Sequence, residues 1–153
     1  QNSVEVGAFV AISHSLSERD RIRIAINGVQ DVSGVHKGWL SSASAGFESS
    51  VSPKLSFAGN LNVTYASAEY ASTYFTVTPA GAMSSGLSSF KAKSGIKDIG
   101  ASVNIAYAID QRWSLFGIGA YKQLVGSAAE SPIVKDAGSA GQFVGGIGIG
   151  WSF

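Results

Sequence analysis

The sequence has no cysteine, only three prolines and few charged side chains in 153 residues. Without cysteine it forms no disulfide bond and no thiolate metal site. Charged residues make up 14% of the chain, against about 25% in soluble domains. The 11 basic residues are scattered and nearly balanced by 10 acidic ones, so no nucleic-acid surface is predicted. No apolar run approaches the ~18 residues of a membrane-spanning helix.

What the sequence has is a two-residue alternation of apolar with small or polar side chains. Side chains of a β-strand point alternately to opposite faces, so this period predicts strands. An ordinary strand of a soluble sandwich is the alternative explanation for any one segment. The seven predicted strands cover residues 4–14, 21–30, 39–51, 55–67, 99–109, 113–124 and 143–153.

The last predicted strand, FVGGIGIGWSF, has one apolar face and one face made mostly of glycine. A strand that meets lipid outside and a small-residue lumen inside has this composition. The segment ends in Trp151 and Phe153, and this terminal aromatic pattern resembles the C-terminal assembly signal of bacterial outer-membrane β-barrels.

The connections and the aromatic residues favour a membrane barrel over a soluble one. Longer connections (31–38, 68–97, 126–141) alternate with short turns (15–20, 52–54, 110–112), as in outer-membrane barrels. No outward position in the predicted strands is charged, whereas a soluble lipocalin-like barrel would be charged outside. Outward aromatic residues form two girdles: Trp39, Tyr65, Tyr121 and Phe143 at the long-loop end, and Phe47, Phe57, Tyr107 and Trp113 at the short-turn end.

The predicted fold is therefore all-β, an antiparallel transmembrane β-barrel in the bacterial outer membrane. Seven strands are too few, because single-chain bacterial barrels have even strand numbers. Either a strand within Thr73 to Thr78 is missed, or N-terminal strands are absent from residues 1–153, and we favour the second interpretation. Residues 79–86 are expected to form a short helix within an otherwise irregular long loop.

One predicted cluster lies in the lumen. Pairing residues 21–30 with 39–51 gives partner numbers that sum to about 69 to 71, which places Arg21 and Arg23 near Glu48. We expect this ion cluster to fill and partly plug the lumen. A charged constriction that selects solutes is the alternative.

The sequence gives little support for catalysis. Asp31, Ser33 and His36 are the residue types of a hydrolase triad, but their short polar segment is also what a loop requires. His14 stands at a strand end, where a solvated histidine is ordinary, and two histidines make no metal cluster. We therefore predict no enzyme activity, no cofactor and no metal.

Several segments resemble a known family: QDVSGVHKG (30–38), TYFTVTPAGAMSSGL (73–87), DQRWSLFGIGAYKQLVG (110–126), AAESPIVKDAGSAGQF (128–143) and the final GIGWSF. They are similar to the MipA/OmpV family of outer-membrane proteins, named for an MltA-interacting protein. The resemblance covers nearly the whole chain, but the family's N-terminal region, roughly the first third of its barrel, has no counterpart here.

The resemblance implies an outer-membrane barrel that acts as a non-enzymatic scaffold. Its implied partners are membrane lipid, a lytic murein transglycosylase and a penicillin-binding murein synthase. Other family members resemble porin-like proteins, so a channel for small solutes is the alternative function. Location is better supported than role, because one fold carries many functions.

Overall fold

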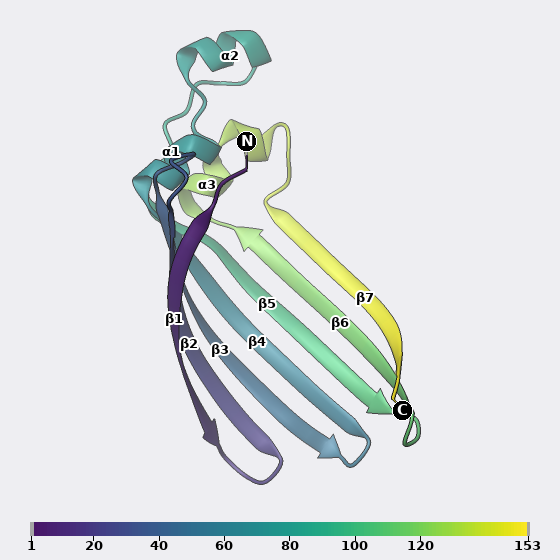
Figure 1. The fold of residues 1–153 in the computed structure, drawn as a ribbon. Helices are drawn as coiled ribbons and strands as arrows, with labels where there is room; N and C mark the ends of the chain where they lie inside the picture. Colours follow the sequence, from purple (N-terminus) through teal and green to yellow (C-terminus); the bar gives the residue numbers. More distant parts are fainter. Residues whose placement is uncertain (1, 153) are drawn as a thin grey trace.

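The computed structural model describes residues 2–152 (Figure 1). No helix in this range is long and apolar enough to cross a membrane. The strands are β1 (Glu5–Ser15), β2 (Asp20–Asp31), β3 (Trp39–Ser52), β4 (Leu55–Ala66), β5 (Gly95–Ala108), β6 (Trp113–Leu124) and β7 (Gly141–Trp151). The helices are α1 (Ala68–Phe75), α2 (Pro79–Ser85), α3 (Gly126–Glu130) and α4 (Pro132–Lys135).

All seven strands belong to one antiparallel sheet, in which each strand pairs with the next along the chain. This confirms the predicted all-β antiparallel fold. Over residues 2–152, β1 and β7 each pair on one side only, so the sheet is not closed. The curved, open arrangement in Figure 1 is consistent with part of a barrel.

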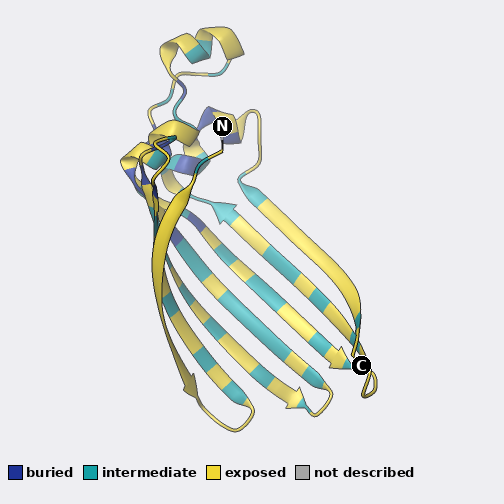
Figure 2. Cartoon of the chain, viewed as in Figure 1, coloured by how far each residue is buried: buried dark blue, intermediate teal, exposed yellow. Residues whose placement is uncertain are grey.

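The two faces of the sheet differ in what covers them. We call the face that carries Asp31, Thr64 and Asp98 inward, because these residues are buried where α1 and α3 pack. The opposite face is outward and apolar, and most of its large side chains are exposed: Ile147 is 90% exposed. Figure 2 shows buried residues gathered near the helices and alternating exposure along the strands. The buried apolar residues are Ala66, Ala71, Val77, Ala92, Ala128 and Val134.

Strand β6 fits the alternation least well in the sequence, because Phe116 and Ile118 fall on the inward face. The register explains this: Phe116 pairs with Gly148 and Ile118 with Gly146. The bare inward face of β7 therefore leaves room for the two bulky side chains of its neighbour.

The long connections contain more structure than the sequence predicted. Residues 68–97 are not simply a loop, since α1 occupies 68–75, and the segment considered for a further strand contains its last turn and a single bridge between Val77 and Phe90. Helix α2 confirms the helix expected at 79–86. It begins at Thr78, whose hydroxyl accepts from Gly81 N, and ends at Gly86 with a positive φ of 76°.

Helices also occupy the second long connection, where α3 and α4 lie within residues 126–141. Such short helices carry no two-residue period and no long apolar stripe, which is why the pattern did not reveal them. Strand β5 begins at Gly95 and not at residue 99, so it includes Lys97 and Asp98.

Candidate functional site

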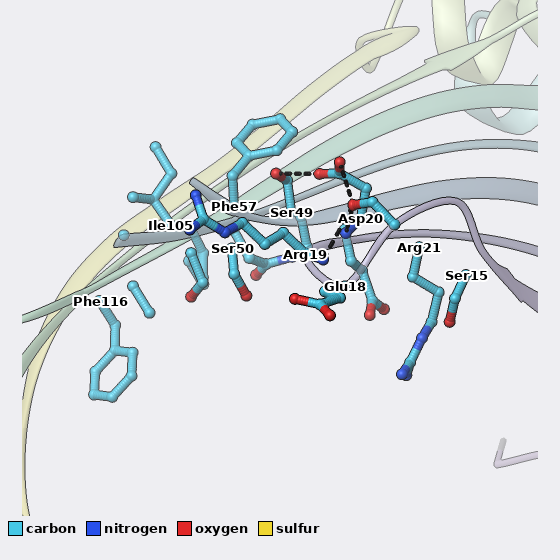
Figure 3. Close-up of a pocket in the computed structure, with 18 residues that line it drawn as sticks. Ser15, Glu18, Arg19, Asp20, Arg21, Ser49, Ser50, Phe57, Ile105 and Phe116 are labelled. Carbon is cyan, nitrogen blue, oxygen red and sulfur yellow. Dashed lines mark hydrogen bonds between the residues drawn. The ribbon is translucent and has the colours of Figure 1, made fainter. Parts of the chain in front are cut away.

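A pocket of about 410 Å³ opens on the inward face at the short-turn end of the sheet (Figure 3). The turn between β1 and β2 supplies Glu18 and Arg19, and the adjoining strands supply Arg21 and Glu48. The opposite wall is uncharged and comes from β4, β5 and β6: Ser56, Ala58, Asn104, Ala106, Phe116 and Ile118.

The turn that carries the pocket is fixed by Asp20. Its carboxylate accepts from the hydroxyls of Ser17 at 2.8 Å and Ser49 at 2.7 Å. Ser17 Oγ also accepts from the backbone N–H groups of Arg19 and Asp20. The turn is therefore held by its own hydrogen bonds. Figure 3 shows the Arg19 side chain crossing the pocket and the Arg21 side chain extending the other way, beside Ser15.

The strand pairing predicted for the lumen cluster is the observed one. Arg21 lies directly opposite Glu48, a pair whose numbers sum to 69, and both line the pocket. Arg23 lies opposite Gly46, one step further from the turn. No ion pair within 4.0 Å joins these three side chains. The cluster therefore consists of neighbouring charges that are not bonded to one another.

The long-loop end of the inward face is different, because its polar groups are buried and bonded. Asp31 is 6% exposed and accepts four hydrogen bonds. Its Oδ1 accepts from Ser33 N and Ser33 Oγ, and its Oδ2 accepts from His36 N and Lys37 N, at 2.6 to 2.9 Å. Asp31 is thus the centre of the loop that follows β2.

These contacts do not assemble the hydrolase triad. Ser33 Oγ donates to Asp31 and accepts from Val4 N, while His36 Nε2 lies 3.0 Å from Glu5 Oε1. His36 Nδ1 accepts from Gly38 N at 3.1 Å, which leaves Nε2 to carry the proton toward Glu5. No hydrogen bond joins His36 to Ser33, the serine that it would have to activate.

Helix α1 packs on this buried loop through aromatic side chains. Tyr70 meets the His36 ring edge-on, with centroids 5.1 Å apart, and Tyr74 lies 5.6 Å from the same ring. Ser67 begins the helix, and its hydroxyl accepts from Tyr70 N and also from Trp39 N, so it joins α1 to β3. Ser131 Oγ, fully buried, donates to Phe75 O and joins the second group of helices to the first.

An ion pair that sequence reasoning missed lies beneath α1. Lys97 Nζ is 2.8 Å from Asp98 Oδ2 and 5.5 Å from the centre of the Tyr70 ring. Asp98 is fully buried, and apart from this ion pair neither of its carboxylate oxygens has a hydrogen-bond partner. Burial, together with nearby Tyr74, Glu5 and Asp98, raises the pKa of Tyr70 against the opposing effect of Lys97. The sequence feature that could have revealed this pair is Asp98, which comes directly before the strand predicted to begin at residue 99.

The outward aromatic residues predicted for the girdles lie near the strand ends. Trp39 stacks on Tyr65 with ring centroids 5.4 Å apart, and Tyr121 pairs with Phe143. At the short-turn end, the rings of Trp113 and Trp151 lie 6.4 Å apart. Phe47, Phe57 and Tyr107 occupy the same outward face. Phe153, the other residue of the predicted assembly signal, lies outside the described residues.

A family model described as MltA-interacting protein MipA matches residues 1–153. The chain belongs to the MipA family. No curated protein matches it. The family's name associates its members with MltA, and the MipA match agrees with the resemblance in the sequence.

Nothing in the described part of this MipA-family chain forms a metal site of three or more histidine, aspartate or glutamate side chains. His14, on the outward face of β1, pairs with Ile22 and lies away from His36. Two places therefore stand as candidates for function: the open charged pocket at the short-turn end and the buried polar cluster under α1.

Proposed function

We propose that this chain is part of an outer-membrane β-barrel that serves as a non-enzymatic scaffold for murein-processing enzymes. The composition of the outward face is the main support for a membrane barrel. Its large apolar side chains are exposed on every strand, and no charged residue lies among them between the two aromatic girdles. Exposing such an apolar surface to water is unfavourable, whereas membrane lipid would cover it.

The helices at the long-loop end favour a membrane anchor over an open channel. Helices α1 and α3 pack over the inward face there, where Thr64 and Asp98 are buried. A lumen covered at one end suits a protein that holds partners and does not conduct solutes.

The partner surface in this proposal is the short-turn end, which faces the periplasm in outer-membrane barrels. MltA, a lytic transglycosylase, is the partner that the family's name supports. A penicillin-binding murein synthase is the second partner of the proposed complex.

Capture of these enzymes tests the scaffold. The full protein, immobilised from detergent extracts of its own membrane, is expected to retain the transglycosylase. Replacing the turns at 16–19, 52–54 and 110–112 with Gly-Ser turns of equal length is expected to abolish retention. Replacing α2 in the same way is the matched control, because α2 lies at the other end of the sheet (Figure 1). Equal retention by all variants contradicts the proposal.

A channel for small solutes is the second candidate, and the charged pocket is the observation that favours it. Planar bilayers distinguish the two functions. The scaffold predicts no ion-selective conductance from the full protein, whereas selective conductance that Glu48→Gln reverses would establish the channel.

A further inference from the structure

Opposite charges face each other at the short-turn end without neutralising each other. Arg21 and Glu48 are direct cross-strand partners, a position in which Cβ atoms are about 5 Å apart. Such pairs ordinarily bond, yet the ion pairs of residues 2–152 are elsewhere, at His36 with Glu5 and at Lys97 with Asp98. Both side chains are exposed within the pocket. They are therefore available to groups from outside the chain.

The other charged side chains around the pocket form no ion pair with Arg21 or Glu48. Asp20 is engaged by Ser17 and Ser49, and Figure 3 shows Arg19 crossing the pocket toward Ser50 while Arg21 extends the other way, beside Ser15. The pocket volume of about 410 Å³ lies in the range that holds small ligands. The wall opposite the charges is small and partly apolar, with Phe116 and Ile118 at one side.

We propose that this pocket binds the free ends of a short zwitterionic peptide. The guanidinium of Arg21 offers paired N–H donors to the terminal carboxylate, and the Glu48 carboxylate accepts from the terminal ammonium. Phe116 and Ile118 line the far side of the same pocket, on β6. The inference rests on the proposed function, which puts the short turns in the periplasm. Short peptides with unmodified ends carry both of these charged groups.

Calorimetry with the full protein in detergent micelles tests the site. Tri-alanine with free ends is expected to bind at least about tenfold more tightly than its N-acetylated or C-amidated form, since each blocked form loses a charge-assisted contact. Arg21→Gln is expected to remove the preference against the amide, and Glu48→Gln the preference against the acetyl form. Arg23→Gln is the matched control, because Arg23 is an inward cation outside the pocket.

Two results would overturn the assignment: equal affinity for free and blocked peptides, or equal losses from Arg21→Gln and Arg23→Gln. Heat-modifiable gel mobility establishes that each variant is folded. A disaccharide-linked stem peptide, whose N-terminus is acylated by the lactyl group of the sugar, is expected to bind as weakly as the N-acetylated form, and tighter binding would contradict the role of Glu48. If peptides do not bind while the transglycosylase is still captured, the pocket assignment fails and the scaffold stands. The reverse result removes the scaffold alone.

Discussion

The two ends of the inward face use charge in opposite ways. At the long-loop end, Asp31 accepts four hydrogen bonds and Asp98 is paired with Lys97, all beneath helices. At the short-turn end, Arg21 and Glu48 are exposed and unbonded to each other. Buried charges must be compensated or they destabilise the fold, whereas exposed charges cost little. One end is therefore built to hold structure, and the other is available for contact.

The largest expected effect comes from removing one member of the buried pair. Lys97→Met leaves Asp98 buried without its cation, which should lower the free energy of unfolding by about 3–5 kcal/mol. Urea unfolding followed by tryptophan fluorescence measures the change. Arg21→Met, at the other end, should change stability by less than about 0.5 kcal/mol.

The double variant Lys97→Met/Asp98→Asn sharpens this comparison, because it removes both charges. It should recover much of the lost stability. Equal stability of the Lys97→Met and Arg21→Met variants would show that the two ends do not differ in this way.

The second largest effect should come from Gly38→Ala. A Cβ atom at residue 38 would lie 2.4 Å from Tyr70 N and 2.9 Å from Tyr70 Cα, so α1 would have to move. We expect about 1–3 kcal/mol of destabilisation and faster hydrogen exchange in α1. Gly28→Ala is the control, since the nearest atom to its Cβ is 3.9 Å away. Unchanged exchange in α1 would mean that the helix is not held by this contact.

A third effect, of about the same size, should follow from His36→Ala. This change removes the contacts of the His36 ring with Tyr70 and Tyr74 and leaves Gly38 N without its acceptor. We expect roughly 1–3 kcal/mol of destabilisation, without loss of any hydrolytic activity, because no hydrogen bond joins Ser33 to His36. His14→Ala, on the outward face, is the matched control. A hydrolytic activity that disappears with His36→Ala would contradict the structural role.

Much of the sheet was predictable, since each strand has a period of two and its register follows from short turns. The pairing of Arg21 with Glu48 followed from counting along one loop. The buried cluster was not predictable, because Asp98 and Tyr70 are far apart in sequence. They come close only because α1, which carries Tyr70, packs over the sheet. Helix α1 shows no long apolar stripe, and its contact with the loop after β2 depends on Gly38 leaving room for Tyr70.

The smallest expected effect concerns acid at the short-turn end. Asp110 accepts from Arg112 N at 2.7 Å and Trp113 N at 2.8 Å, and these bonds hold its pKa below the ordinary 3.8. A lowered pKa in the folded state gives stability that is present above the unfolded value and is lost as pH falls through the folded value. Stability should therefore decrease slightly below about pH 4. Asp110→Asn should flatten this part of the profile, and an unchanged slope would contradict the assignment.

Because the inward face of β7 is rich in glycine, the side-chain sizes allowed on β6 and β7 depend on each other. A Cβ atom on Gly150 would lie 2.6 Å from Phe116 Cε2, so the space that one strand gives up is filled by the ring of the other. Enlarging position 150 therefore demands a smaller or displaced side chain at position 116. Sequence variation in β6 and β7 should accordingly be inherited in pairs, and a library that varies only one of the two strands will sample mostly crowded or hollow combinations.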